Sequence, residues 1–582
     1  MRTWRPVHLD VPRFDREFFD GTERFTQIGN GEVGGKAAGL LFVREALARS
    51  VEAGRFPRCD VHIPILTVIT TDLFERFLAL NHLGDIAASE GPDGRLAHAF
   101  QQGSLPPELV GDLRALIVKV HTPLAVRSSS LLEDDLHEPF AGVYATKMIP
   151  NHQLDADSRF RRLVEAVKYV WASTYFAGAR SYRRSTGHAD RDEKMAVIVQ
   201  EVIGRRHGDR FYPDLSGVAR SYSFYRTGQA RPEDGVVSLA LGLGKTIVDG
   251  GIAWTYSPRF PRVAPPTGSV RDLLRQTQVE FWAVNMGKPP AYDPVAETEY
   301  LIRADLAQAE DDGTLQHVAS TYDPASDRLS PGIDRAGARV LNFAPLLALE
   351  TFPLNDLGRG LLAACQEALD APVEIEFAAT FDRERMHVGF LQVRPMVTSE
   401  GVVDLTYPDL DGPGVVVASD SVMGNGTLDG IQDLVFVKPE TFEARLTPVM
   451  ASEIAALNRR LVADARPYVL IGFGRWGSAD PWLGIPVGWG QIGGARVIVE
   501  VSDSAMNVEL SQGSHFFHNL SSFRVTYFSV KRTASNRVDW RWLAGLPIIE
   551  DTGHVCHVRA PEPVQVQVDG RQGHGLILRH GN

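Results

Sequence analysis

Polar and apolar residues alternate over residues 374–377 (EIEF), and a second run that reads as a strand lies nearby at residues 389–395 (GFLQVRP). Alternation with a period of two predicts a β-strand and puts Glu374 and Glu376 on one face. The turn between the runs predicts a hairpin, so that an amide and an arginine lie beside the two acids. Hard oxygen ligands next to a guanidinium suit Mg²⁺ bound to nucleotide phosphates.

Apolar runs at residues 431–437, 495–501 and 525–530 predict further strands in the last third of the chain. Between the last two strands, a Gly-Ser-His sequence within residues 511–519 predicts the opening of a short helix. This sequence loosely resembles the TSHAA loop in the swivelling domain of phosphoenolpyruvate synthases, and the resemblance implies His515 as a phosphoacceptor, since a neutral imidazole near pH 7 is a competent nucleophile towards a polarised phosphoryl group. His518 is a weaker candidate, and a structural role is the alternative for both.

Two glycine- and serine-containing segments predict anion binding. Residues 34–40 (GGKAAGL) predict a glycine turn that opens a helix, where backbone amides and a lysine meet an anion. The spacing is not that of a P-loop, so a P-loop nucleotidase is disfavoured. In residues 123–145, Arg127 stands at a strand end before three serines and a small-residue loop at residues 141–142, the chemistry of a polyphosphate cradle.

These segments belong to a series of seven short motifs in the order of a known family. Over roughly residues 25–398, about two thirds of the chain, the sequence resembles the nucleotide-binding domain of the phosphoenolpyruvate synthase and pyruvate phosphate dikinase family, an ATP-grasp domain. The motifs are GGKAAGL (34–40), LAVRSSS to FAGVY (124–144), VWASTYFAGARSYR (170–183), MAVIVQEVI (195–203), SGVA (216–219), LGLGKTIVDG (241–250) and VEIEF to LQVRP (373–395).

The resemblance implies ATP and Mg²⁺ as cofactors and a role for each matching residue. The resemblance implies that Lys36 and Arg127 bind the ATP phosphates and that Gln200, after its strand, lies at the adenine end. Glu376 and Gln392 would bind Mg²⁺, and Arg394 would contact the transferred phosphate. The expected catalytic residues are Lys36, Arg127, Arg394 and His515, and the expected ATP-binding set is Lys36, Arg127, Ser128, Gly142, Gln200, Glu374, Glu376, Gln392 and Arg394. The alternative for the two glutamates is an outward strand face paired with lysines, worth little energetically.

Two positions depart from the family pattern. Glu374 stands where the family usually has aspartate, one methylene shorter, and Lys245 stands where the family's GLGE loop has glutamate. The second change reverses a charge beside the expected phosphates.

The resulting functional hypothesis is a dikinase-like, ATP- and Mg²⁺-dependent phosphotransferase that acts on an unknown small-molecule acceptor. An alternative is an ATP-binding regulatory or sensor protein whose catalysis is weakened by Lys245. An ATP-grasp ligase that joins a carboxylate to an amine shares the fold, but the motifs resemble the dikinase branch.

We expect an α/β (α+β) architecture with an N-terminal extension (1–24), an ATP-grasp first lobe (25–205), a second lobe with the metal hairpin (206–400) and a C-terminal α/β domain (401–582). The last segment is too short for both a swivelling domain and a (β/α)₈ barrel of about 250 residues, so a complete pyruvate-to-phosphoenolpyruvate cycle is not expected. The C-terminal part also holds a glycine-rich turn at residues 472–484, with Arg475 and Trp476. It either closes on a small ligand or packs the domain.

The amino-acid composition limits the classes of partner that we expect. The 582 residues are 44% hydrophobic and 23% charged, with a formal net charge of −12 and three cysteines. An acidic balance without a long basic run argues against nucleic acid as the main partner. Three widely spaced cysteines support neither a disulfide framework nor a zinc knuckle. Without an apolar run of about eighteen residues, we expect no membrane partner and a cytoplasmic location.

Overall fold

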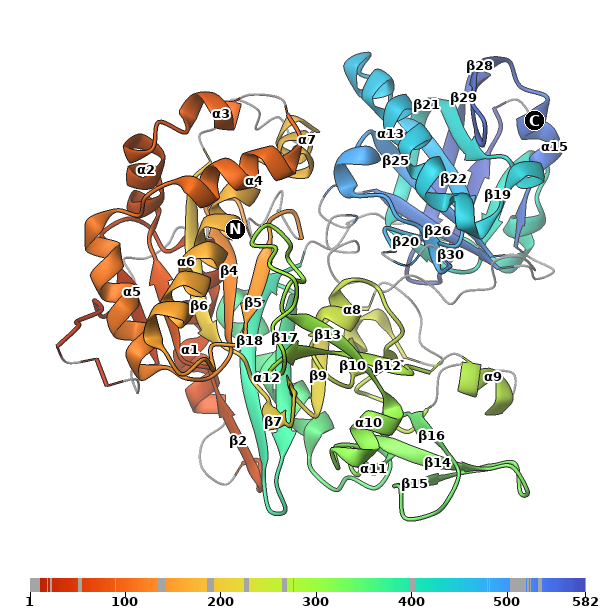
Figure 1. The fold of residues 1–582 in the computed structure, drawn as a ribbon. Coiled ribbons are helices and arrows are strands. Elements are labelled where there is room, and N and C mark those ends of the chain that lie inside the picture. The colour runs from red at the N-terminus through yellow and green to blue at the C-terminus, as the bar shows by residue number, and fades with distance from the viewer. Residues whose placement is uncertain are drawn as a thin grey trace.

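The computed structural model describes residues 11–17, 19–20, 24–50, 55–88, 91–133, 142–185, 193–223, 230–263, 270–275, 277–396, 403–478, 480, 482–502, 520, 523, 525–531 and 536–580. The chain forms several β-sheets with helices between their strands, which confirms the expected α/β class. Figure 1 shows a helix-rich first lobe, a second lobe below it and a C-terminal body at the upper right.

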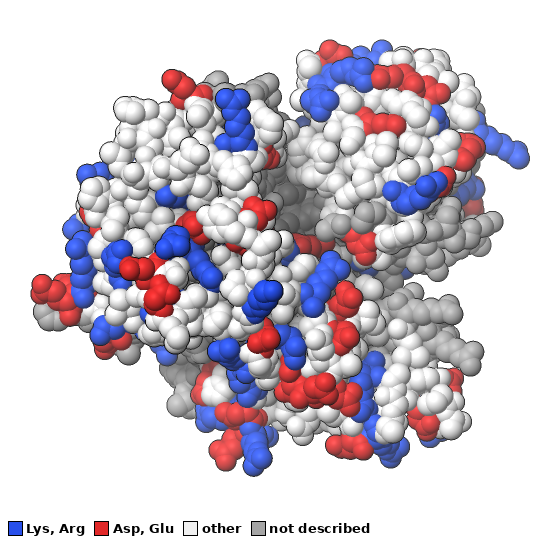
Figure 2. All heavy atoms as spheres, in the orientation of Figure 1, with Lys and Arg blue, Asp and Glu red and all other residues white. Residues whose placement is uncertain are grey.

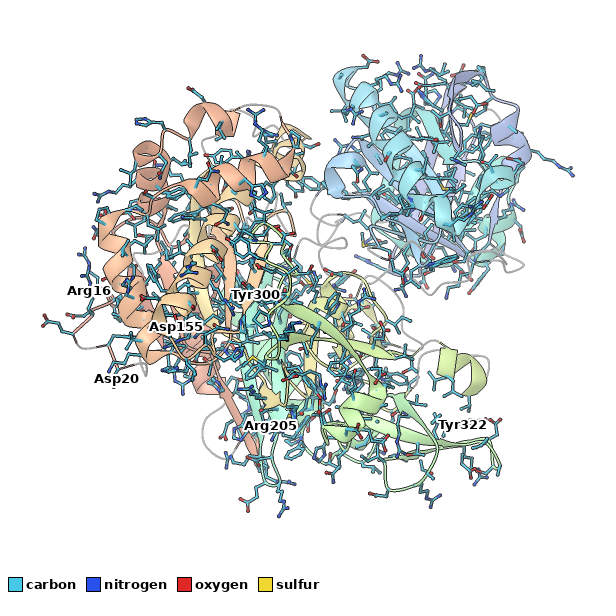
Figure 3. All side chains as sticks on the ribbon, in the orientation of Figure 1. Arg16, Asp20, Asp155, Arg205, Tyr300 and Tyr322 are labelled. Atoms are coloured by element: carbon cyan, nitrogen blue, oxygen red, sulfur yellow. The ribbon has the colours of Figure 1, made fainter. Side chains whose placement is uncertain are left out.

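The first-lobe sheet has five strands in the order β1-β3-β6-β4-β5. They are β1 (Phe25–Ile28), β3 (Leu66–Ile69), β6 (Met195–Glu201), β4 (Leu124–Ser130) and β5 (Thr146–Ile149). The helices of this lobe are α2 (Thr71–Leu80), α3 (Gly84–Ala88), α4 (Asp93–Gln102), α5 (Pro107–Lys119), α6 (Ala156–Ser173) and α7 (Ala177–Ser185). Asp155, labelled in Figure 3, caps α6 by accepting a hydrogen bond from the Ser158 amide at 2.6 Å.

The second-lobe sheet has six strands in the order β11-β10-β9-β17-β18-β2. They are β11 (Trp254–Tyr256), β10 (Val236–Ala240), β9 (Leu215–Arg220), β17 (Val373–Phe381), β18 (Met386–Pro395) and β2 (Cys59–His62). The antiparallel pairing of β17 with β18 confirms the predicted hairpin. β2 lies within the segment expected to form the first lobe, yet it pairs with β18.

Helices α1 (Gly34–Ser50) and α12 (Leu354–Leu369) pack on one another beside the second-lobe sheet. Ile375 of β17 shares a buried apolar cluster with Leu361 and Cys365 of α12 and with Leu40 of α1. Because side chains alternate across a strand, Glu374 and Glu376 lie on the opposite face of β17 from these helices.

Two smaller sheets and several short helices complete the second lobe. One sheet runs β13 (Leu301–Asp305), β12 (Glu280–Asn285), β8 (Arg210–Tyr212), β7 (Arg205–His207), and the other runs β15 (Arg328–Pro331), β14 (Ala319–Asp323), β16 (Ala338–Leu341). The short helices are α8 (Lys245–Val248), α9 (Val270–Arg275), α10 (Leu306–Asp311) and α11 (Ala344–Leu347).

The C-terminal body, residues 403–580, is built on one ten-stranded sheet. Its central strands β21 (Asn425–Val437), β22 (Tyr468–Phe473), β25 (Ala495–Ser502) and β26 (Thr526–Lys531) are parallel and contain the three predicted apolar runs. The other strands are β20 (Val422–Met423), β29 (Val555–Asp569), β30 (His574–Leu578), β19 (Val415–Ser419), β27 (Arg537–Val538) and β28 (Ile548–Asp551). Beside them lie α13 (Thr447–Ala463), α15 (Trp540–Ala544), the 3₁₀ turn η5 (Trp489–Gln491) and a small pair, β23 (Arg475–Trp476) with β24 (Gly484–Ile485).

A single apolar cluster runs from the first lobe into the C-terminal body. Trp171 and Tyr182 are fully buried in it. At the junction, the Phe523 ring lies 5.3 Å from the rings of both Tyr182 and Trp489. The C-terminal body is therefore packed against α7 of the first lobe.

The charged side chains are of mixed sign. On the face shown in Figure 2, Lys and Arg alternate with Asp and Glu. Across the stretches of chain that the structure describes, no helix combines the length and the apolar character that a membrane crossing needs.

Candidate active site

The candidate site lies where β4 and β6 of the first lobe meet the β17–β18 hairpin of the second, and Arg127 joins the two lobes. Its Nη1 donates to Gln200 Oε1 at 3.2 Å and to the Leu391 carbonyl at 3.0 Å. Its Nη2 donates to Gln392 Oε1 at 2.6 Å and lies 3.5 Å from Glu376 Oε2. One guanidinium thus contacts three of the strands, which suits a planar cation with five donors.

The hairpin register puts Glu374 opposite Arg394 and Glu376 opposite Gln392. Glu374 is held by two arginines: Arg394 Nε lies 2.7 Å from its Oε1, and Arg220 Nε lies 2.5 Å from its Oε2. The side chain of Glu374 is only 2% exposed, which excludes an outward, solvated strand face for this residue. Glu376 is 15% exposed, and its carboxylate faces Arg127. The two glutamates therefore have different surroundings, although they share a face.

Lys36 lies in the first turn of α1, and the turn before it requires glycine. Gly34 has φ +77°, and a Cβ atom there would lie 1.6 Å from the Ser129 carbonyl oxygen. Lys36 Nζ donates to Ser128 Oγ at 3.1 Å and pairs with Glu133 Oε1 at 2.8 Å. The expected lysine therefore reaches the strand that carries Arg127.

The serine hydroxyls differ from the phosphate contacts that we expected. Ser128, Ser129 and Ser130 are all fully buried. Ser128 Oγ donates to Glu133 at 2.9 Å, Ser129 Oγ donates to the Val33 carbonyl at 2.8 Å, and Ser130 Oγ accepts from the Glu133 amide at 3.1 Å. These hydroxyls bind the protein itself, so the cradle reduces to charged side chains and backbone.

A second buried carboxyl group, Glu193, lies behind Glu133. Burial raises the pKa of Glu193 to about 7, and the Glu133 charge adds to the rise while Ser130, the Leu132 amide and Arg183 oppose it. Among the described residues, no donor reaches its Oε2. Glu193 is consequently a proton-holding group close to neutral pH.

Gln200 and Gly142 complete the expected set. Gln200 lies within β6, not after it, and its amide oxygen is turned to Arg127. This differs from the expected position at an adenine end beyond the strand. Gly142 has φ +66° in the turn before β5, where a residue with a side chain would be strained.

Lys245, which stands where the family has glutamate, forms ion pairs with two acids of this chain. Its Nζ lies 2.9 Å from Asp249 Oδ2, one turn along α8, and 3.8 Å from Glu297 Oε1. Burial opposes the charged form, but Asp249 and Glu297 raise the pKa of Lys245 overall. The lysine charge is therefore compensated by two acids.

Of the two motifs expected in the C-terminal body, residues 511–519 and the glycine-rich turn at residues 472–484, the structure describes only parts of the second. His515 and His518 lie outside the described residues. In the glycine-rich turn, Trp476 is 1% exposed and its Nε1 donates to the Val499 carbonyl at 3.1 Å, while Arg475 is buried and donates to the Gly250 carbonyl. The turn packs the C-terminal body and contacts the second lobe.

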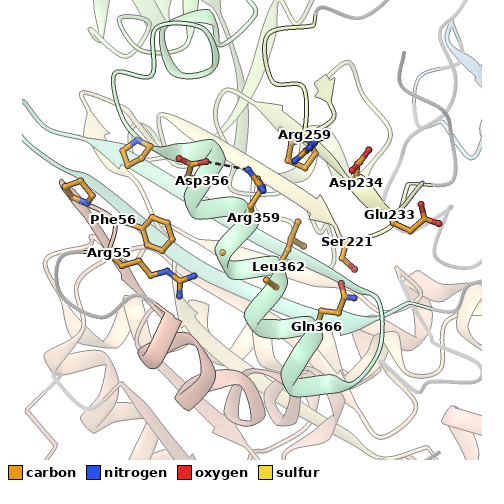
Figure 4. A pocket seen from close by; sticks show the side chains of 15 residues that line it. Arg55, Phe56, Ser221, Glu233, Asp234, Arg259, Asp356, Arg359, Leu362 and Gln366 are labelled. Carbon is orange, nitrogen blue, oxygen red and sulfur yellow. Dashed lines mark ion pairs between the residues drawn. The ribbon is translucent and has the colours of Figure 1, made fainter. Parts of the chain in front are cut away.

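A cavity of about 750 Å³ lies elsewhere, on the α12 side of the second-lobe sheet, as Figure 4 shows. It is lined by Phe56, by Ser221 and by Arg359, which faces Asp356 at 3.9 Å. Ser221 follows directly after Arg220, whose side chain reaches Glu374 on the other face. The cavity is therefore separated from the candidate site by the sheet.

The residues present fit a magnesium ion in part. In the described part of the chain no three His, Cys, Asp or Glu side chains form a metal cage. Glu376 Oε2 and Gln392 Oε1 nevertheless both lie near Arg127 Nη2, so one carboxylate and one amide oxygen converge. Mg²⁺ commonly takes one or two protein ligands and completes its shell with phosphates and water.

Two lobes, a hairpin with an acid and an amide, and basic residues from both sides offer the chemistry that nucleotide phosphates require. The chain belongs to the family described as pyruvate phosphate dikinase, AMP/ATP-binding domain, whose model matches residues 30–404. This range includes every site residue from Lys36 to Arg394.

Two relatives are similar over part of this range. A phosphoenolpyruvate synthase of Aeropyrum pernix is 29% identical over 195 residues, 30% of this chain and 21% of the relative. A rifampicin phosphotransferase of Streptomyces sviceus is 26% identical over 211 residues, 33% of this chain and 22% of the relative. The chain thus aligns with about a fifth of each curated relative's length.

Sequence reasoning missed three groups that hold the site together: Glu133, Glu193 and Arg220. Glu133 follows the three serines within a few residues, and that nearness to Arg127 was a usable signal. Arg220 and Glu193 lie 154 and 61 residues from the partners they reach, so only the fold brings them in.

Proposed function

We propose that this protein is an ATP- and Mg²⁺-dependent phosphotransferase of the dikinase type that acts on a small-molecule acceptor. The observation that carries the proposal is the position of Arg127, which contacts Gln392 and Glu376 on the far lobe and Gln200 on its own. Membership of a family whose model describes an AMP/ATP-binding domain supports ATP as the nucleotide.

In this proposal, Lys36 and Arg127 hold the phosphates from the first-lobe side, and Arg394 approaches them from the hairpin. Glu374 fixes the Arg394 guanidinium, and Arg394 Nη2 lies 4.0 Å from Glu376 Oε1. Preorganised cations stabilise charge on phosphoryl oxygens without reorganising during the reaction. Glu376 and Gln392 would hold Mg²⁺, which would supply positive charge to neutralise the phosphates.

We further propose that the phosphoryl group passes through His515. An imidazole nitrogen would attack the γ- or β-phosphorus of ATP and form a P–N bond as the bond to the bridging oxygen breaks. That oxygen would leave with ADP after attack at the γ-phosphorus, or with AMP after attack at the β-phosphorus, which puts both outer phosphates on the imidazole. Two described features support this route. The parallel strand β25 ends at Ser502, thirteen positions before His515 in the chain, and ligands bind at the carboxyl edge of such sheets. Arg475, which follows the carboxyl end of the neighbouring β22, contacts the second lobe.

The experiment incubates the protein with Mg²⁺ and β- or γ-labelled ATP, and compares wild type with His515→Ala and His518→Ala. Acid-labile label on the protein and the nucleotide products are both scored. Label that requires His515, with AMP as product, supports the dikinase route. ADP with label points to a single phosphoryl transfer. Tight ATP binding without label or turnover would favour the regulatory alternative.

A further inference from the structure

The loop between β12 and β13, residues 286–300, leaves the second lobe and is anchored on the first; we call it the strap. Glu299 on the strap pairs with Lys147 of β5 at 2.6 Å, and the two side chains are 2% and 1% exposed. Lys147 Nζ also donates to the Pro294 carbonyl at 2.9 Å. The ring of Tyr300, labelled in Figure 3, lies under the Arg162 guanidinium of α6 at 5.2 Å. The strap therefore connects the two lobes through a buried ion pair.

Two residues before Glu299, the strap presents a second acid, Glu297, to Lys245 of α8. Lys245 lies between Glu297 Oε1 at 3.8 Å and Asp249 Oδ2 at 2.9 Å. The turn that follows α8 is closed by hydrogen bonds from the Gly251 amide to the Thr246 carbonyl, 2.8 Å, and from the Gly250 amide to the Ile247 carbonyl, 3.1 Å. Lys245 and Asp249 thus tie the two ends of this helical turn to each other and to the strap.

The same turn receives the C-terminal body. Arg475 Nη1 donates to the Gly250 carbonyl at 2.7 Å, and this contact is buried. A second contact lies on the first lobe, where Ser181 Oγ of α7 donates to the Gly490 carbonyl at 3.0 Å. A Cβ atom at Gly490 would lie 2.7 Å from Ser181 Cβ, so the two surfaces meet closely. The C-terminal body thus contacts both lobes through hydrogen bonds to backbone carbonyls.

We propose that Lys245 is a positioning residue that docks the C-terminal body on the nucleotide-binding lobes. By pairing with Glu297 and Asp249, it fixes the Gly250 carbonyl that Arg475 binds, and so sets the carboxyl edge of the C-terminal sheet towards the cleft. The consequence for phosphoryl transfer rests on the proposed function. The docking itself does not, and it can be measured without turnover.

Charge reversal is the sharpest test. Lys245→Glu would bring three acids together, whereas Lys245→Arg keeps the cation, and the exchange Lys245→Glu with Glu297→Lys restores one pair with its signs swapped. Lys288→Glu is the matched control, because Lys288 is an exposed lysine on the same strap. Arg475→Met removes the other partner of the Gly250 carbonyl.

Three quantities are measured on the full chain: the radius of gyration by small-angle scattering, the Kd of a non-hydrolysable ATP analogue, and single-turnover transfer. We expect Lys245→Glu and Arg475→Met to expand the protein and to slow transfer by about 10- to 100-fold, as misplacement of reacting groups does. The Kd should change by less than about threefold, because Lys245 pairs with Asp249 and Glu297 and Arg475 binds the Gly250 carbonyl, and the proposal assigns none of these groups to a phosphate. Lys245→Arg and the exchange should recover compactness.

Three outcomes would overturn the inference: an unchanged radius of gyration in both Lys245→Glu and Arg475→Met, a loss of ATP-analogue binding in Lys245→Glu that exceeds any change in compactness, or faster transfer in Lys245→Glu. If wild type itself transfers no phosphate, the proposed function fails while the scattering comparison still decides the docking role.

Discussion

Arg127 and Gln392 lie 265 residues apart in the chain, yet Arg127 Nη2 donates to Gln392 Oε1 at 2.6 Å. The bond joins β4 of the first-lobe sheet to β18 of the second-lobe sheet. The same nitrogen lies 3.5 Å from Glu376 Oε2. This guanidinium contacts both lobes at an acid–amide pair and brings positive charge to the site, so changes at Arg127 test the site directly.

Arg127→Lys should abolish most of the activity without unfolding the protein. A lysine keeps the charge but cannot reach Gln200, Leu391 and Gln392 together, because it lacks the planar fork of donors. We expect kcat to fall by about 100-fold or more and the ATP analogue to bind about tenfold more weakly. Arg328→Lys, at an exposed arginine on β15, is the control and should leave both unchanged. Equal effects in the two variants would contradict the assignment.

Glu374 and Glu376 should separate stability from activity. Glu374→Gln leaves two buried arginines without their carboxylate and should lower the free energy of unfolding by about 3–5 kcal/mol. Glu376→Gln alters a partly exposed acid and should cost about 1 kcal/mol or less, while it raises the Mg²⁺ concentration needed for half-maximal activity.

Urea unfolding and Mg²⁺ titration of the two variants measure this contrast. Glu374→Asp, which introduces the residue usual in the family, is the matched comparison and should retain most of the stability, since the carboxylate remains. A Glu376→Gln variant with the metal dependence of wild type would remove Glu376 from the metal site.

Glu133→Gln should weaken the fold and tighten nucleotide binding. Glu133 is 1% exposed on its side chain and accepts hydrogen bonds from Lys36, Ser128 and the Ser130 amide. Losing a charged acceptor there should cost about 1–3 kcal/mol of stability. The competing negative charge beside Lys36 is also removed, so calorimetric titration with an ATP analogue should give an affinity several-fold higher. A tenfold loss of affinity would instead mean that Glu133 is needed to orient Lys36.

Glu193→Gln should change how stability depends on pH. The pKa of Glu193 rises from an ordinary 4.5 to about 7 on folding, so the native state binds more protons than the unfolded state between these values. Stability therefore falls as the pH rises through that window, and the difference amounts to about 3 kcal/mol. In Glu193→Gln this part of the fall should disappear, with a net gain in stability above about pH 7.

Urea midpoints of the first-lobe transition between pH 5 and pH 8 would show the effect of Glu193→Gln. Glu384→Gln, at an exposed glutamate, should follow the wild-type curve. If the stability of the wild type does not change over this pH range, the raised pKa of Glu193 is refuted.

The sequence predicted the hairpin that carries Glu374 and Glu376, the helix after Gly34–Gly35, and three strands of the C-terminal body. Each of these follows from local regularities: alternation along a strand, glycine at a turn, or an apolar run of strand length. The sequence also indicated the chemical class of the ligand, because an arginine beside serines and two acids on one strand restrict the ligands that they can bind.

The tertiary structure decided which side chains each of these residues pairs with. The sequence put both glutamates in equivalent positions, but Arg220, 154 residues before Glu374, makes one of them a buried structural acid. The three serines looked like phosphate ligands, but Ser129 donates to the Val33 carbonyl just before α1, and Ser128 and Ser130 are hydrogen-bonded to Glu133. Lys245 looked like an unbalanced charge, and the strap supplies Glu297 to balance it.

Such pairings arise from sheet order and from loops that cross between lobes, and no local pattern encodes which strand lies beside which. A chain therefore specifies its elements and its chemical groups through short-range preferences. The environment that fixes the charge and reach of each group is set by contacts between distant segments, which form only when the whole core is assembled.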